Sequence, residues 1–120
     1  MKILLDSSVL ISVMRDRIVL DSSQEYFINP IVYGEVAYGL ENMGKSLANL
    51  DLFLESRHIM VVDIGVSTAK IFAIAKVKLK NNPIADNDLL IGCSAMEYKT
   101  KIWTLNKKHF ERIPGLVMVE

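Results

Sequence analysis

The chain has 120 residues, of which 51% are apolar and 23% are charged, and its mean hydropathy is +0.27. This composition is typical of one compact domain with a well-filled core, so we expect neither a disordered tail nor a multidomain protein. The 14 basic and 14 acidic residues cancel, so the overall charge does not predict nucleic-acid binding, which would need a local patch.

Cysteine content and hydropathy bear on the compartment. A single cysteine, Cys93, argues against an internal disulfide framework and a cysteine-rich metal site, and it fits a reducing compartment. The apolar run at residues 3–5 is too short for a signal peptide, and no run approaches the roughly 18 apolar residues of a membrane span. We therefore expect a soluble, cytoplasmic protein that does not contact a membrane.

Short apolar runs alternate with longer amphipathic segments, which predicts strands alternating with helices. In chain order, we expect a strand over residues 2–5, a helix over 9–13, a strand over 26–28, helices over 30–42 and 47–54, a strand over 59–62, helices ending at 79 and spanning 89–98, and strands over 101–105 and 116–119. This alternation predicts a single α/β domain with three layers, in which helices cover both faces of a mostly parallel sheet.

The helix that ends at Leu79 is expected to begin at a Ser67 or Thr68 cap. Its lysines should face solvent and its apolar residues should face the core. The residues expected to face inward are Ile71, Phe72, Ile74, Ala75 and Val77.

Polar residues follow the predicted strands and begin the predicted helices. Asp6 follows the first strand and Asn106 follows the fourth, so both should lie at the carboxyl edge of the sheet, where ligands bind. Asp88 lies in the first turn of its helix. Glu35 lies roughly 8 Å into its helix at 1.5 Å per residue. The neighbours of Glu35 on that helix are apolar or small, so its carboxylate should be partly desolvated.

Carboxylates that converge without a basic residue repel one another and raise their own pKa values. A hard divalent cation such as Mg²⁺ or Mn²⁺ removes that penalty and is typically bound by carboxylates together with substrate phosphate oxygens. Such an ion can activate water and stabilise charge at phosphorus, as in phosphodiester cleavage. Nucleic acid would supply the phosphate.

Each candidate also has a structural interpretation. Asp6 could simply cap a helix, Asp86 could cap the helix that follows it, and Asp88 could be an acid placed to suit the helix dipole. Thr104 and Asn106 could close a turn. Outside this group, Cys93 and Trp103 are predicted to be core residues, and His58 and His109 lack partners at zinc spacing.

Four segments resemble one known family: residues 4–11, 35–39, 87–92 and 104–116 are similar to those of PIN domains. The likeness is greatest to the VapC-type toxin ribonucleases of toxin–antitoxin pairs. This resemblance implies a metal-dependent endoribonuclease that uses Mg²⁺ or Mn²⁺ and acts on RNA. It also implies a homodimer, and a cognate antitoxin whose tail occupies the active-site groove.

By position, the resemblance assigns Asp6, Glu35 and Asp88 as metal ligands or as groups that hold metal-bound water. Thr104 matches a hydroxyl beside these acids. Asn106 stands where many family members have a fourth aspartate. The amide removes one negative charge, so a second metal should bind more weakly or only with RNA phosphate. Asp86 remains an auxiliary candidate.

The second half of the chain is basic, with nine basic and six acidic residues over 61–120, against five and eight over 1–60. Many of these lysines would simply form a solvated helix face. However, Lys107, Lys108 and Arg112 directly follow Asn106, so we expect them to border the acidic site and contact RNA phosphates.

Three alternatives compete with the nuclease interpretation. A PIN-fold binding module in RNA processing would keep the fold with weak catalysis. A receiver-like phosphorylation domain could use Asp63, but it needs an acidic pair where Asp6 is followed by serines. A haloacid-dehalogenase-like phosphatase needs a second aspartate where Ser8 stands.

Overall fold

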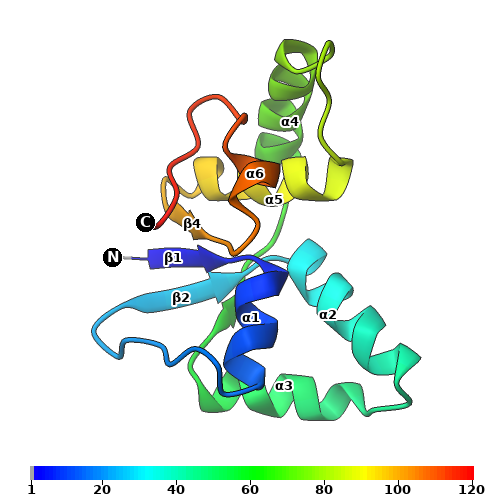
Figure 1. The fold of residues 1–120 in the computed structure, drawn as a ribbon, viewed down its shortest axis with the longest axis vertical. Coiled ribbons are helices and arrows are strands. Elements are labelled where there is room, and N and C mark those ends of the chain that lie inside the picture. The colour runs from blue at the N-terminus through cyan, green and yellow to red at the C-terminus, as the bar shows by residue number, and fades with distance from the viewer. Residues whose placement is uncertain (1) are drawn as a thin grey trace.

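A computed structural model describes residues 2–120, and Figure 1 shows how their helices and strands are arranged. The elements in chain order are β1 (Lys2–Leu5), α1 (Ser7–Met14), β2 (Glu25–Ile28), α2 (Pro30–Asn42), α3 (Leu47–Ser56), β3 (Met60–Val61), α4 (Val66–Lys78), α5 (Asp86–Glu97), β4 (Lys101–Trp103) and α6 (Lys107–Phe110). The four strands form one sheet in the order β3-β2-β1-β4, and every pairing is parallel. The predicted α/β fold is confirmed.

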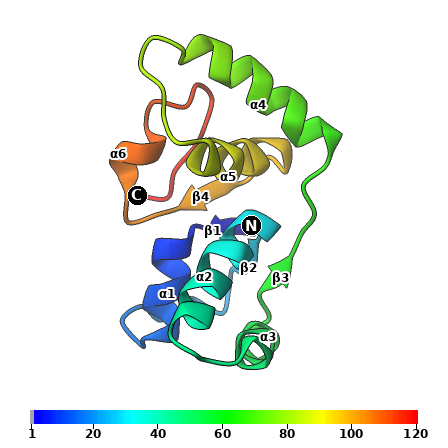
Figure 2. The same ribbon diagram turned by 90° about the vertical axis from the view of Figure 1, so that its right-hand side faces the viewer.

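The sheet lies between two layers of helices. Right-handed crossovers place the helices that link β1, β2 and β3 on one face and those that link β3 to β4 on the other. Figure 2, seen toward the carboxyl ends of the strands, shows α1, α2 and α3 on one side and α4 and α5 on the opposite side. The central strands β1 and β2 are buried on both faces, so Leu4, Leu5 and Ile28 are fully enclosed, as is Ile102 in the middle of β4.

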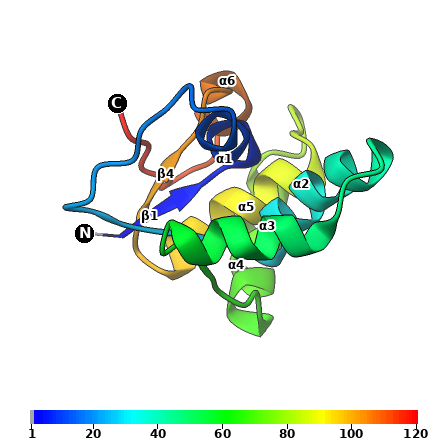
Figure 3. The same cartoon turned by 90° about the horizontal axis from the view of Figure 1, so that it is seen from below.

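The carboxyl ends of β1 and β4 lie next to each other. Leu5 is in register with Trp103, and the Asp6 amide donates to the Trp103 carbonyl at 3.0 Å. The residues after these two strands are therefore neighbours, although almost one hundred positions separate them. The chain end, marked C, lies on the same left-hand side of the view as the start of β1 (Figure 3).

Residues 116–119 were predicted to form the last strand, and this prediction is wrong. Met118 makes a single parallel bridge to Ile102, whose amide donates to Val117 and whose carbonyl accepts from Val119. The C-terminal segment therefore meets the three-residue strand β4 at one bridged residue and does not extend into a strand.

The prediction for α4 needs two corrections. Gly65, not Ser67 or Thr68, precedes the helix, and Thr68 is buried with its hydroxyl donating to the Glu97 carboxylate. The side chains of Ile74 and Val77 do not face inward, because they are 60% and 66% exposed. The reason is that α4 is an outer helix that packs mainly on α5, so only a narrow face is covered.

Two boundaries also shift. α5 begins at Asp86, with Ala85 in the capping position, so Asp86 is not the cap. Residues 107–110, which lie between the predicted strands at 101–105 and 116–119, form the short helix α6. No helix within residues 2–120 combines the length and apolar character needed to cross a membrane.

Candidate active site

The carboxyl edge of the sheet collects side chains from four distant parts of the chain. Asp6 follows β1, and Thr104 and Asn106 follow β4. Asn29 caps α2 by accepting from the Val32 amide at 2.9 Å, which fixes the helix that carries Glu35 directly after β2. Asp88 lies in the first turn of α5.

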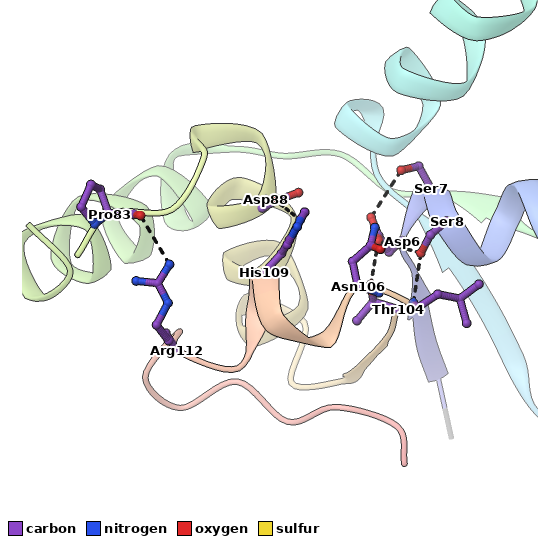
Figure 4. A network of polar contacts seen from close by, with 10 residues as sticks. Asp6, Ser7, Ser8, Pro83, Asp88, Thr104, Asn106, His109 and Arg112 are labelled. Atoms are coloured by element: carbon purple, nitrogen blue, oxygen red, sulfur yellow. Dashed lines mark hydrogen bonds and ion pairs between the residues drawn. The ribbon is translucent and has the colours of Figure 1, made fainter.

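Hydroxyl groups hold the Asp6 carboxylate in one orientation (Figure 4). Asp6 is 2% exposed, and its Oδ2 accepts from Thr104 Oγ1 at 2.8 Å and from Ser8 Oγ at 3.0 Å. Its Oδ1 has one long contact, to Ser7 Oγ at 3.5 Å. Asp6 occupies the N-cap position of α1, but its side chain makes no capping hydrogen bond. The carboxylate is therefore held for another purpose.

The two hydroxyls that bind Asp6 are themselves held by backbone amides. Thr104 Oγ1 accepts from the Asn106 amide at 2.9 Å, and Ser8 Oγ accepts from the Leu105 amide at 3.0 Å. Their hydrogens are thereby left for Asp6. Ser8 is a site residue that sequence reasoning missed; the signal was a hydroxyl two positions after a strand-terminal aspartate.

Glu35 is partly desolvated, as its apolar helical neighbours predict. Burial raises the pKa of the Glu35 carboxyl, and the negative charges of Asp6 and Asp88 raise it further, while Ser7 and Asn87 oppose the shift. Within residues 2–120, the buried Oε1 of Glu35 has no hydrogen-bond partner. A buried acid beside two others is costly without a positive charge.

Asp88 shares this environment. Burial raises the pKa of the Asp88 carboxyl, the His109 imidazole lowers it, and the charge of Asp6 raises it. His109 Nδ1 lies 3.1 Å from Asp88 Oδ2 (Figure 4). By contrast, Asp86 is exposed and forms an ion pair with Lys76 at 3.0 Å.

The acidic side chains suit a hard divalent cation, because such ions prefer carboxylate oxygens. Across residues 2–120, no three His, Cys, Asp or Glu side chains lie together as a ready-made ligand cluster. However, Asp6 and Asp88 are close enough to disfavour ionisation of Glu35, and a Glu35 oxygen is buried without a partner. A cation among them would relieve both penalties, so the residues fit such an ion without being closed around it.

The basic residues after β4 differ in what they contact. Lys107 and Lys108 are exposed on α6, beside Asn106, which is also exposed. Arg112 instead donates to the backbone carbonyls of Asn82 and Pro83, so its guanidinium tethers the loop before α5.

Other sequence candidates are outside the site. Cys93 is buried, and burial raises the pKa of its thiol to about 11, so the thiol stays protonated at neutral pH. A cavity of about 850 Å³ lies near the amino ends of β2 and β3, and its lining includes Tyr26, Leu54 and Ile59 but none of the acids above. The lining also carries Glu25, Glu55 and His58. We place the chemistry at Asp6, Glu35 and Asp88 because these acids influence one another's ionisation.

Comparisons of the sequence with known proteins agree on one family. The PIN domain family model matches residues 3–116. Ribonuclease VapC of Rickettsia bellii is 30% identical, over 97% of this chain and 93% of the relative. Ribonuclease VapC1 of Methanocaldococcus jannaschii is 35% identical, over 93% of this chain and 81% of the relative.

Solved structures show the same fold. VapBC2 of Rickettsia felis, bound to a DNA fragment from its promoter, contains a chain that superimposes with a TM-score of 0.83 at 24% identity, covering 99% of this chain and 98% of that one. A chain of VapBC-1 from nontypeable Haemophilus influenzae superimposes with a TM-score of 0.82 at 24% identity, and the match covers 100% of this chain and 98% of that one. The strand order here also differs from the 2-1-3-4-5 order of receiver domains, which removes that alternative.

Proposed function

This chain belongs to the PIN-domain family, and from that premise we propose that it is a VapC-type endoribonuclease, the toxin of a toxin–antitoxin pair. The observation that carries the proposal is the meeting of Asp6, Glu35 and Asp88, from three distant segments, at one edge of the sheet. Their mutual effect on ionisation supports a site that needs a cation.

The cation would be Mg²⁺ or Mn²⁺, held by Asp6, Glu35 and Asp88 directly or through water. When bound, such an ion supplies an activated water and stabilises charge that develops at phosphorus. The protein's own contribution is orientation, because Ser8 and Thr104 keep Asp6 in place. Asn106 removes the charge of a fourth acid, which favours one tightly bound ion over two.

The partners follow from the family. We propose RNA as the substrate, the cytoplasm as the location, and a cognate antitoxin that covers the acidic site. The structural neighbours named VapBC support an antitoxin partner. We also propose that the present chain forms a homodimer.

Lys107 and Lys108 are proposed to contact RNA phosphates beside the acids, together with those N–H groups of Arg112 that do not donate to Asn82 and Pro83. Reversing the charge of both lysines, Lys107→Glu with Lys108→Glu, should lower RNA affinity and reduce the salt slope of binding by about two, since each phosphate contact contributes about one. Fluorescence anisotropy with labelled RNA in EDTA measures both quantities without cleavage.

The matched control is Lys2→Glu with Lys99→Glu, an equal charge change near the amino ends of the strands. This control should keep the wild-type salt slope. An unchanged slope in the Lys107 and Lys108 variant, or an equal drop in the control, would contradict a contact at α6.

The proposed function is tested by incubating the purified chain with structured and unstructured RNA in EDTA, Mg²⁺ or Mn²⁺. We expect cleavage that requires a divalent ion. Absence of cleavage on a broad RNA set, with RNA still bound, would instead favour a PIN-fold binding module.

A further inference from the structure

His109 contacts the acidic site, which the sequence analysis did not predict. His109 Nδ1 lies 3.1 Å from Asp88 Oδ2, and the histidine side chain is 58% exposed while that of Asp88 is 20% exposed. An ionised carboxylate can only accept, so Nδ1 must carry the hydrogen in this contact. The contact joins α6 to the first turn of α5.

The position of His109 is set by close packing of the C-terminal segment on α5. Phe110 and Ile113 are buried, and Gly92 faces them one turn after Asp88. A Cβ at Gly92 would lie 2.6 Å from Ile113 Cδ1, so the absence of a side chain at Gly92 lets the segment approach this closely. Residues that follow His109 therefore hold it against the helix face that carries Asp88.

Residues 104–110 contact two of the three acids. Thr104, at the start of this segment, donates to Asp6 Oδ2, and His109, near its end, contacts Asp88 Oδ2. In both acids, Oδ2 is engaged by a protein group at 3.1 Å or less, whereas Oδ1 of Asp6 has the long contact to Ser7. Partners of this kind fix the orientation of metal-binding carboxylates and typically change metal affinity 10–100-fold when removed.

We propose that His109 is a positioning residue for the metal site: its imidazole engages Oδ2 of Asp88 and so leaves the other oxygen to a divalent ion. This inference rests on the proposed function, because it assumes that Asp88 helps to hold the ion. It assigns no ligand role to the imidazole itself.

The test is Mn²⁺ affinity, measured without RNA from the electron paramagnetic resonance signal of free Mn²⁺. His109→Ala and His109→Gln should weaken binding about tenfold. His109→Asn should stay within about threefold of wild type, because the Asn amide nitrogen can take the place of Nδ1, whereas that of Gln corresponds more nearly to Nε2. His58→Asn, at an exposed histidine outside the site, is the matched control.

Two further readouts separate positioning from a structural role. In an Asp88→Asn background, His109→Ala should have no additional effect on Mn²⁺ affinity, since the two changes remove one interaction. RNA cleavage by His109→Ala should recover at about tenfold higher Mn²⁺. Thermal melting in EDTA identifies any variant that fails to fold.

Wild-type affinity in His109→Ala, or equal losses in the Asn and Gln variants when all are folded, would overturn the proposal. If wild type itself binds no Mn²⁺, the metal site of the proposed function fails, and the role of His109 fails with it. RNA cleavage that persists with a weakened His109 variant at high Mn²⁺ supports both.

Discussion

Replacing Asp6 with asparagine is expected to reduce RNA cleavage at least about 100-fold, because Asp6 is proposed to hold the ion and its loss should exceed the loss of an outer partner. The fold should persist, since the amide oxygen can still accept from Ser8 and Thr104. Removing the Asp6 charge also relieves its repulsion of Glu35. We therefore expect a melting temperature in EDTA at or above that of wild type.

The control for this variant is Asp63→Asn, which changes the aspartate that follows the edge strand β3. The backbone carbonyl of Asp63 accepts from the Tyr98 hydroxyl, and this contact survives the change. Cleavage by Asp63→Asn should stay within about twofold of wild type. Equal cleavage by Asp6→Asn and wild type would point to a contaminating nuclease or to a different site.

Replacing Glu35 with glutamine should abolish cleavage and at the same time stabilise the metal-free protein. The carboxyl is half-buried with a buried oxygen that lacks a partner, so ionising it in the folded state is costly. We expect a gain of about 1 kcal/mol in the free energy of unfolding at pH 7, discounted for the partial exposure of the group. Chemical denaturation in EDTA measures it.

The stability gained by Glu35→Gln should depend on pH, and the raised pKa of Glu35 sets the direction of this dependence. Burial raises the pKa of Glu35 above its ordinary value of 4.5, so the folded state retains the proton to higher pH than the unfolded state. Stability from this group is greatest below pH 4.5 and falls as pH rises through the raised pKa. Glu35→Gln should remove that fall, so its advantage should grow between pH 4 and pH 7.

Divalent ions should stabilise wild type and Glu35→Gln to different extents. Mn²⁺ should raise the melting temperature of wild type, because it binds only the folded state, and should raise that of Glu35→Gln much less. A glutamine variant that is less stable than wild type in EDTA, with an unchanged pH profile, would show that Glu35 is an ordinary structural acid.

Sequence patterns within a few residues predicted where several of the site residues lie. A short apolar run that stops at a polar residue marks the end of a buried strand, and this placed Asp6 and Asn106 at one edge of the sheet. The apolar neighbours of Glu35 on one helix face predicted its desolvation. These features depend on spacing within a few residues, so the sequence alone expresses them.

Contacts made at long range could not be predicted in this way. The hydrogen bond from Thr104 to Asp6 joins residues 98 positions apart, and the contact of His109 with Asp88 spans 21 positions. The first depends on the pairing of β4 with β1, and the second on how closely the C-terminal segment packs on α5. The exposed Ile74 and Val77 were missed for a related reason, because amphipathicity does not say how much of a helix its neighbours cover.

Diffraction from a manganese-soaked crystal, recorded at the manganese absorption edge, tests most directly whether three distant acids share one divalent ion. We expect an anomalous peak bound by Asp6, Glu35 and Asp88, directly or through water. Side chains of Glu35 and Asp88 that point away from Asp6, with no anomalous peak among them, would contradict it.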